Sequence, residues 1–463
     1  MTTRVLFGAG IYARKYTALL EYLGMDFDYF VDNDCNKWGK IFFGKKVISP
    51  DDLLQIKHCE IIISCIHKCE IYEQLQKNGF TGSFLTLQEL YQKFESKILM
   101  MPCERCAGTL ADKQKTLFID IFEGLGWGGT EQWAYELTRG IKEFGGITPI
   151  LLGNREQTTV NENCTDFLIR IPGRDTIAEL VELFEKSIPF VLVNNFGGCA
   201  LLAADIVKHR YPGKVKIVSV IHNDKEDLFD EHLLLHDATD IVFCVSNQIR
   251  TKIIKKYGID EEKCAFKEQP IWAVKKRCKK AVNKTINIAY AGRLVRCQKR
   301  SDLLPDFICS LEEKGIDYHF QIAGEGECFP EIERFIQQQD LSNRVELLGR
   351  LDKENMGEFW ENQDVFINLS EFEGTSLSML EAMGHGCTPV VTNVSGAHEF
   401  ITEGENGYIC EVGDLDGLGR SIQELYLDRK RLERYGEESR KRIIDRCDPK
   451  KYMNYWLKEI ILD

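Results

Sequence analysis

The chain has 463 residues, a formal net charge of −13, 44% hydrophobic and 28% charged residues. At roughly 150 residues per domain this length predicts about three domains, and the composition excludes a mostly disordered or fibrous chain. The acidic balance argues against a protein that binds nucleic-acid backbones, and no apolar run approaches the roughly 18 residues of a membrane helix. The start, Met1-Thr2-Thr3-Arg4, lacks a signal-peptide pattern, and the 17 cysteines show no secreted-scaffold spacing. We therefore expect reduced thiols and a cytoplasmic protein.

A short apolar strand followed by glycines and a helical pattern occurs three times, at Val5–Phe7, Leu117–Phe122 and Ile286–Ala291. Such an opening starts a doubly wound α/β domain, so we expect an α/β protein with three Rossmann-like domains. The predicted organisation is an N-terminal domain over 1–97, a linker over 98–115, a second domain over 116–272, a third domain over 273–448 and a C-terminal amphipathic helix over 449–463.

The remaining strands are predicted from short apolar runs between turn signals and helical stretches. They are Asp28–Val31, Glu60–Ser64 and Ser83–Leu87 in the first domain, Pro149–Leu152, Phe190–Val193, Lys216–Ile221 and Ile241–Cys244 in the second, and Tyr318–Ile322, Val345–Leu348, Val365–Leu369 and Thr388–Thr392 in the third.

The densest chemical signal follows the strand Val365–Leu369, in the segment Ser370-Glu371-Phe372-Glu373-Gly374-Thr375-Ser376. Thr375 and Ser376 are good N-cap residues for the helix that follows. Free backbone N–H groups and the helix dipole at such a point favour a phosphate. Glu373 in the loop and Glu381 inside the helix fit a ligand that also carries hydroxyl groups, as a sugar and a ribose do.

Positive charge is concentrated upstream, in Gly292-Arg293-Leu294-Val295-Arg296-Cys297-Gln298-Lys299-Arg300, which follows the first strand of the third domain. Arg293 and Lys299 on such a loop could neutralise a leaving diphosphate.

Three features together resemble family 4 of the retaining glycosyltransferases over about residues 116–463. They are Gly292-Arg293…Lys299, the pair Glu373…Glu381 with seven residues between, and Gly386-x-x-Pro389-Val390-Val391. The resemblance implies the GT-B fold, in which two Rossmann-like domains face each other across a cleft. The C-terminal domain of the family binds a nucleotide-sugar, and a final helix crosses back to the N-terminal one.

The resemblance also implies roles for single residues. Arg293 and Lys299 would hold the diphosphate, and Glu381 would bind the ribose. Glu373 and His222 would lie at the transferred sugar; the family's His-Asp is here His222-Asn223-Asp224. The catalytic candidates are thus His222, Arg293, Lys299 and Glu373, and the donor-binding candidates are Gly128, Gly129, Gly292, Arg350 (at the base), Gly374, Thr375, Ser376, Leu377 and Glu381.

The implied reaction moves a sugar from an NDP-sugar, most simply a UDP-sugar, to a hydroxyl of a glycan or lipid-linked acceptor in bacterial surface-polysaccharide synthesis. No metal and no cofactor would be required, and the expected partners include no nucleic acid. Peripheral contact with the inner face of the membrane stays open. The alternatives are a non-catalytic glycosyltransferase-like partner subunit and an NAD-dependent oxidoreductase that uses the N-terminal domain.

The N-terminal domain carries Gly8-x-Gly10-x-x-Ala13, and Asp32 ends the next strand 24 residues beyond Gly8. This spacing matches a dinucleotide-binding fingerprint. The stretch also resembles small Rossmann-like domains attached to bacterial sugar-modifying enzymes. Three interpretations stay open, namely NAD binding, binding of another nucleotide or sugar, and a structural or assembly role.

Two patterns could hold a metal and are interpreted otherwise. Asp32-Asn33-Asp34 imitates an Asp-x-Asp metal motif but lies far in sequence from the donor motifs. Cys103-x-x-Cys106 could form half a zinc site with Cys59, Cys65 or Cys69, yet no second Cys-x-x-Cys exists. The basic run from Lys275 to Lys280 fits a solvated hinge better than a lipid contact.

Overall fold

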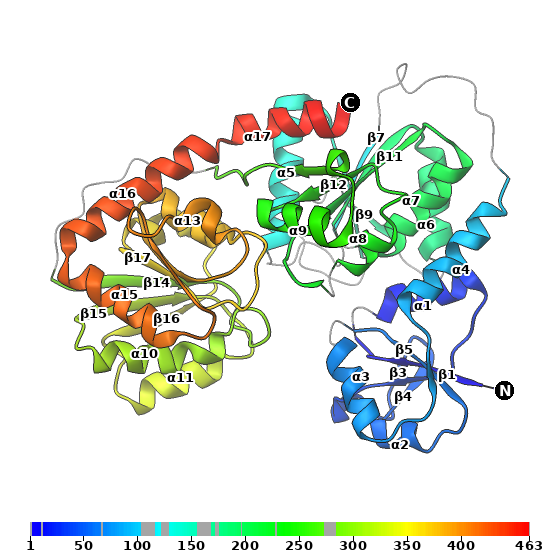
Figure 1. Cartoon of the computed structure of the whole chain (residues 1–463), viewed down its shortest axis with the longest axis horizontal. Helices are drawn as coiled ribbons and strands as arrows, with labels where there is room; N and C mark the ends of the chain where they lie inside the picture. The colour runs from blue at the N-terminus through cyan, green and yellow to red at the C-terminus, as the bar shows by residue number, and fades with distance from the viewer. Residues whose placement is uncertain are drawn as a thin grey trace. The chain divides into compact units, whose positions relative to one another are not determined.

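The computed structural model describes residues 2–10, 13–65, 68–102, 116–121, 129–154, 168–171, 176–195, 197–226, 229–272 and 284–462. These residues contain three β-sheets whose strands alternate with helices, as the sequence predicts (Figure 1). By its internal contacts the chain divides into two compact units. Unit 1 comprises residues 1–126, 147–220 and 226–242, and unit 2 comprises residues 127–146, 221–225 and 243–463.

The first sheet has the order β3-β4-β2-β1-β5-β6, with β3 antiparallel to β4 and the other pairs parallel. The elements are β1 (Thr3–Phe7), α1 (Ala13–Leu23), β2 (Tyr29–Val31), β3 (Ile41–Phe42), β4 (Lys45–Ile48), α2 (Pro50–Leu54), β5 (Cys59–Ile63), α3 (Lys68–Lys77), β6 (Ser83–Phe84) and α4 (Leu87–Leu99). The predicted strand Ser83–Leu87 is too long, because Thr86 caps α4 in a capping box with Glu89 and ends the strand early. The β3–β4 hairpin was not predicted.

The second sheet has the order β13-β12-β11-β10-β7-β8-β9. Its elements are β7 (Thr116–Asp120), α5 (Gly129–Gly145), β8 (Ile150–Asn154), β9 (Leu168–Ile171), α6 (Thr176–Lys186), β10 (Phe190–Asn194), α7 (Gly198–Arg210), β11 (Val215–Ile221), α8 (Asp230–Leu234), β12 (Ile241–Cys244), α9 (Asn247–Tyr257) and β13 (Cys264–Phe266). The order of the first four strands in the chain places a topological switch point between β7 and β10.

Within unit 1 the first sheet's helices and the second sheet's helices share one hydrophobic core. Leu20 of α1 and Phe94 of α4 belong to the same buried cluster as Leu201 and Ala204 of α7. The N-terminal domain is therefore joined to the second sheet by buried apolar surface, in addition to the chain itself.

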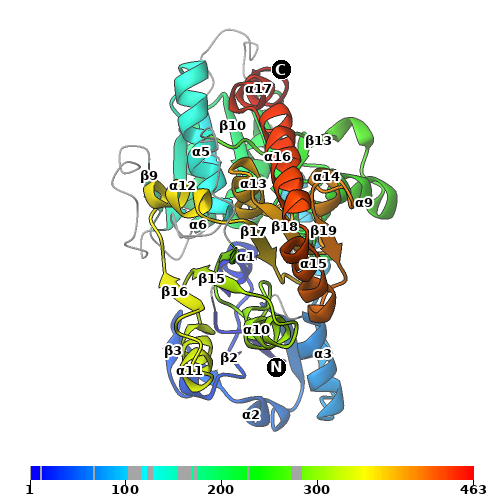
Figure 2. The ribbon, with the colours of Figure 1, turned by 90° about the vertical axis from the view of Figure 1, so that its left-hand side faces the viewer.

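The third sheet has the order β16-β15-β14-β17-β18-β19 with every pair parallel, which is the strand order of a dinucleotide-binding domain. Its elements are β14 (Ile286–Ala291), α10 (Leu304–Glu313), β15 (Tyr318–Ala323), α11 (Phe329–Gln338), β16 (Val345–Gly349), α12 (Lys353–Glu361), β17 (Val365–Asn368), α13 (Leu377–Gly384), β18 (Thr388–Thr392), α14 (Ala397–Phe400), β19 (Tyr408–Cys410), α15 (Leu415–Leu427) and α16 (Arg429–Arg446). Figure 2 shows α16 beside α13. Ile443 of α16 and Cys447, the residue that follows this helix, belong to the same buried cluster as Met379 and Met383 of α13.

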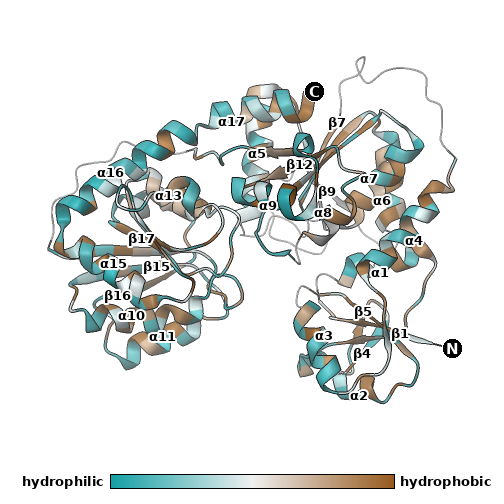
Figure 3. Cartoon of the chain, in the orientation of Figure 1, coloured by the Kyte–Doolittle hydropathy of each residue, from teal (hydrophilic) through white to brown (hydrophobic). Residues whose placement is uncertain are grey.

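The strands of each sheet are apolar and the outer faces of the helices are polar, which is most visible on α16 (Figure 3). This is the pattern expected of strands covered by helices on both faces. None of the helices in the described ranges combines the length and apolar character that crossing a bilayer requires.

The chain ends in α17 (Pro449–Tyr455) and the π-helical segment η7 (Trp456–Leu462). The three residues that the sequence places on the buried face, Tyr452, Trp456 and Ile460, are all buried. Within unit 2 this terminal segment packs against α5, where Gly140 faces Met453 so closely that a Cβ atom would collide with it. The absence of a side chain at Gly140 thus leaves the space that the buried side chain of Met453 fills.

Candidate functional site

The loop between β17 and α13 folds as the sequence predicts for a helix start. Ser376 is the N-cap residue, and its Oγ accepts a hydrogen bond of 3.3 Å from the backbone N–H of Met379. Thr375 does not share this role, because its Oγ1 donates to the carbonyl oxygen of Val245 at 2.8 Å. The backbone N–H groups of the first turn of α13, which begins at Leu377, are thereby presented at a helix N-terminus.

Glu373 is a buried carboxylate at the centre of this loop, with 5% of its surface exposed. Its Oε1 accepts hydrogen bonds from Lys299 Nζ at 2.5 Å and from Ser370 Oγ at 2.7 Å. A charge buried in this way needs a paired countercharge, because desolvation of an isolated carboxylate is costly. The structure thus joins two of the four catalytic candidates in one ion pair.

A second chain segment, residues 222–224, lies directly against the same loop. A Cβ atom at Gly374 would collide with the carbonyl oxygen of His222, and the backbone N–H of Asp224 donates to the carbonyl oxygen of Glu373 at 2.9 Å. The side chain of Gln298 donates to Asn223 Oδ1 at 3.1 Å. His222 is therefore fixed by its backbone next to the loop that carries Glu373.

Arg293 lies on the loop after β14 and is exposed, with its guanidinium donating to Gln298 Oε1 at 2.8 Å. The buried Tyr290 hydroxyl donates to the carbonyl oxygen of Arg293 at 3.0 Å and holds the loop from below. Gly292 meets the loop after β15, where a Cβ atom at Gly324 would collide with the Gly292 carbonyl oxygen. Gly324 has a φ of 155° and was not singled out from the sequence.

Glu381 lies inside α13, and burial raises the pKa of its carboxyl, with the positive Lys353 opposing that rise. Lys353 begins α12 and forms an ion pair with Glu136 of α5. Burial lowers the pKa of Lys353. Arg350 follows β16 and is exposed.

The glycine-rich loop is only partly described. Gly128 lies outside the described residues. Gly129 is the first residue of α5, and a Cβ atom there would lie 3.9 Å from Leu377 Cδ1 at the start of α13. The N-termini of α5 and α13 therefore approach each other within unit 2.

In the N-terminal domain the carboxylate of Asp32 is bonded to neighbouring residues of its own domain. Asp32 Oδ2 accepts hydrogen bonds from the backbone N–H of Ala9 at 2.9 Å and from Lys37 Nζ at 3.0 Å, and Oδ1 accepts from the backbone N–H of Asp34. Gly8 has a φ of 114° and faces Cys65 across the loop. The carboxylate that a dinucleotide site would offer to a ribose is thus bonded to its own chain, which weighs against the NAD interpretation.

No group of three or more His, Cys, Asp or Glu side chains able to hold a metal ion occurs among the described residues. In Asp32-Asn33-Asp34 the Asp34 carboxylate caps a short 3-10 turn by accepting from the backbone N–H of Asn36. Cys103, Cys106 and the run Lys275–Lys280 lie outside the described residues.

A polar cluster that sequence reasoning missed lies at the carboxyl ends of β7 and β10. Asn194 is fully buried, and its Nδ2 donates to Asp120 Oδ2 at 2.8 Å and to the carbonyl oxygen of Gly197 at 3.0 Å. Asn195 Nδ2 donates to the carbonyl oxygen of Asp120. This is the switch point of the second sheet, where open α/β sheets bind ligands. The signal available in the sequence was a polar Asp120 at the end of an apolar strand and Asn194-Asn195 at the end of another.

Asp120 should make the stability of the protein depend on pH. Burial raises the pKa of its carboxyl from 3.8 to about 7. Since the folded protein holds this proton more tightly than the unfolded chain, the free energy of unfolding should fall as the pH rises through this range. Asp120→Asn has no carboxyl to ionise at high pH. The Tm of the variant minus the Tm of the wild type should therefore be larger at pH 8 than at pH 5. The control is Asp237→Asn, an exposed carboxylate of the same unit. An equal Tm difference at both pH values would contradict the assignment.

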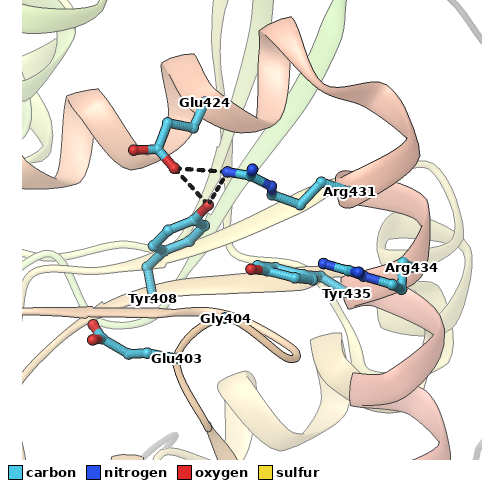
Figure 4. Close-up of a pocket in the computed structure, with 7 residues that line it drawn as sticks. All are labelled: Glu403, Gly404, Tyr408, Glu424, Arg431, Arg434 and Tyr435. Atoms are coloured by element: carbon cyan, nitrogen blue, oxygen red, sulfur yellow. Dashed lines mark hydrogen bonds and ion pairs between the residues drawn. The ribbon is translucent and has the colours of Figure 1, made fainter.

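A pocket of about 440 Å³ lies elsewhere on unit 2, near β19, α15 and α16 (Figure 4). Tyr408 donates to Glu424 at 2.9 Å, Arg431 bonds to both, and Arg434 stacks on Tyr435. None of the predicted donor residues lines it, so it is separate from the site around Glu373.

The fold and this arrangement define a class. Residues 274–442 match the family described as glycosyl transferases group 1, and residues 1–83 match the family described as C2185-like, N-terminal. A crystal structure of Alr3699/HepE from Anabaena in complex with UDP and glucose has a TM-score of 0.61 at 15% identity, over 75% of this chain and 99% of that one.

Curated relatives agree with this class. The chain is 25% identical over 275 residues to the N-acetyl-alpha-D-glucosaminyl L-malate synthase of Bacillus anthracis. This alignment covers 56% of this chain and 70% of that protein. It is 34% identical over 137 residues to the poly(glycerol-phosphate) alpha-glucosyltransferase of Bacillus subtilis (strain 168). This alignment covers 29% of this chain and 20% of that longer protein.

The protein is an α/β glycosyltransferase with the GT-B fold, preceded by an additional Rossmann-like domain. More particularly, residues 274–442 match the model of the glycosyl transferases group 1, in line with the resemblance drawn from Gly292–Lys299 and Glu373–Glu381. This match supports a nucleotide-sugar as the donor substrate.

Proposed function

We propose that this glycosyltransferase belongs to family 4 and transfers a sugar, with retention of anomeric configuration, from a UDP-sugar to a hydroxyl of a glycan or lipid-linked acceptor. The synthesis of a bacterial surface polysaccharide is the proposed setting, in line with the name of the poly(glycerol-phosphate) alpha-glucosyltransferase of Bacillus subtilis. In this proposal residues 273–448 form the donor domain, residues 116–272 with 449–463 form the acceptor domain, and residues 1–97 are accessory.

One observation carries the proposal, namely the ion pair between the buried Glu373 and the partly buried Lys299 at the N-terminus of α13. A cation and helix N–H groups at one point suit a diphosphate, whose charge grows as the sugar leaves. The carboxylate of Glu373 would repel a phosphate, because both are negative. It is suited instead to accept hydrogen bonds from the neutral hydroxyls of the sugar.

The residues then divide the work as follows. Arg293 and Lys299 bind the diphosphate and stabilise the leaving group, while Ser376 and Leu377 present the first-turn N–H groups. Glu373 holds the sugar hydroxyls. The bond to the nucleotide breaks through an oxocarbenium-like state, and the acceptor hydroxyl attacks from the same face and passes its proton to the leaving phosphate. His222 lies beside the transferred sugar and binds it.

The proposed acceptor site is the switch-point edge of the second sheet. Asp120 and the α7 N-terminus, held together through Asn194, lie where ligands bind in this fold. Asp120 as a residue is partly exposed, and a carboxyl at this edge suits a ligand that brings a hydroxyl group.

The test is release of nucleotide from UDP-, GDP- and ADP-sugars by the purified full chain, without acceptor and with EDTA. We expect release from one donor, unchanged by EDTA and abolished by Glu373→Ala. NMR of the sugar product formed before mutarotation would show the retained anomer. Release that EDTA stops, or an inverted product, would overturn the metal-independent retaining assignment. If no donor is bound or hydrolysed, the partner-subunit alternative replaces the proposal.

Glu381 is predicted to act in binding. Glu381→Ala should weaken the affinity for the nucleotide, measured by titration calorimetry with UDP, by roughly 10- to 100-fold, the value of one or two hydrogen bonds to a charged group. Because burial raises the pKa of this carboxyl, the wild-type affinity should also fall at acidic pH, and the variant should lose that dependence. The control is Glu354→Ala on the neighbouring α12. An unchanged affinity for Glu381→Ala would remove its ribose assignment.

A further inference from the structure

The imidazole of His222 is held by residues that lie far from it in the sequence. Its ring packs edge-to-face on the indole of Trp133, with 4.9 Å between the centroids and 74° between the planes. Such aromatic pairs contribute about 0.5–1.5 kcal/mol beyond their buried area and prefer edge-to-face or offset-stacked arrangements. The backbone of His222 is fixed separately by Gly374, so Trp133 acts on the ring.

Trp133 is itself fixed by the C-terminal segment. It is 4% exposed, and its Nε1 donates to the hydroxyl of Tyr452 at 2.8 Å. Trp456 packs on the same indole with 5.5 Å between the ring centroids. Phe243 of β12 packs in turn on Trp456, with 4.7 Å between the ring centroids. A buried indole N–H needs such a partner, and the hydroxyl determines how the ring is rotated.

The hydroxyl of Tyr452 is suited to this task. Its side chain is buried, and burial raises the pKa of Tyr452 above its ordinary value, so the group stays neutral at physiological pH. The helices that carry the two partners pack closely, because Gly140 and Gly145 of α5 leave room for the buried side chains of Met453 and Leu457 of the terminal segment. Tyr452, Trp133 and His222 thus form a continuous chain of side-chain contacts.

We infer that Trp133 and Tyr452 are positioning residues for His222, so that the C-terminal helix sets the orientation of the imidazole without touching substrate. This inference rests on the proposed function, since it takes His222 as the residue beside the transferred sugar. It adds to that function one further element. The hydrogen bond between Trp133 and Tyr452, which lie 319 positions apart in the chain, takes part in positioning the reacting group.

The first measurement is independent of activity. In the full chain with ¹³C-labelled histidine, the His222 imidazole signal is assigned by its loss in His222→Gln. Tyr452→Phe, which keeps the ring and removes the hydroxyl, should shift this signal and its pH midpoint. Tyr455→Phe on the same helix is the matched control and should leave both unchanged. An unmoved His222 signal in Tyr452→Phe overturns the inference. This test does not depend on activity, so it applies even if the wild type hydrolyses no donor and the proposed function has failed.

The second measurement is kinetic. Tyr452→Phe and Trp133→Phe should lower kcat for nucleotide release by roughly 10-fold or more, as small misplacements of a reacting group do, while Kd for UDP stays within about twofold. A lower Tm with unchanged kcat would assign the two residues to stability alone and would overturn the inference. So would a moved His222 signal without any change in kcat.

Discussion

Lys299→Ala is expected to reduce kcat by roughly 10²-fold or more, measured as nucleotide release from the donor that the wild type uses. The ammonium group forms the ion pair with the buried Glu373, and loss of a group that stabilises developing charge has an effect of this size. Lys314→Ala is the matched control, because Lys314 forms an ion pair of the same length with Asp416 on the surface of the same domain. Its kcat should stay within about twofold of the wild type.

The same substitution also leaves the Glu373 carboxylate buried without its cation, which can cost about 3–5 kcal/mol of stability. The double variant Lys299→Ala with Glu373→Gln isolates the effect on stability, because Glu373, itself a proposed catalytic residue, is replaced as well. It should regain the Tm that Lys299→Ala loses, because the buried charge is gone, while its kcat stays low. Recovery of kcat together with Tm would mean that Lys299 serves only to neutralise Glu373 and has no part in catalysis.

Gly374→Ala should abolish most turnover and lower Tm, although it adds a single methyl group. The added Cβ would collide with the carbonyl oxygen of His222 and lie 2.5 Å from Val245 Cγ2. Since backbone cannot rotate away as a side chain can, the Glu373 loop and the His222 segment must separate. Overpacking of this kind costs about 1–3 kcal/mol, and the accompanying displacement of Glu373 should lower kcat by about 10²-fold.

Gly357→Ala is the control for this prediction. Gly357 lies in α12, and a Cβ atom there would meet only His385 Nε2 at an ordinary 3.9 Å. Alanine is the better helix former by about 1 kcal/mol, so this variant should keep wild-type kcat and an equal or higher Tm. A Gly374→Ala variant with normal kcat would show that the close approach of the two segments is dispensable.

Much of the fold could be predicted from local patterns. The strand-turn-helix openings at Val5, Leu117 and Ile286 predict three Rossmann-like sheets, because an apolar strand followed by a glycine-rich turn and a helix is typical of the start of such a sheet. The predicted strands Ile241–Cys244 and Thr388–Thr392 agree with the structure to the residue. The edge strands β3, β9, β13 and β19 escaped prediction, since two to four residues are too few to show a period.

The sequence by itself indicated the class of protein, through Gly292–Lys299 and the Glu373–Glu381 spacing, and it predicted a helix that starts at Thr375 or Ser376. These are local features, written in consecutive residues. Only the tertiary structure decided that Lys299 pairs with Glu373, that His222 lies against Gly374 and that Asp32 bonds to its own loop. The physical reason is that such contacts depend on strand order and on backbone distances of a few ångströms, which no spacing along the chain records.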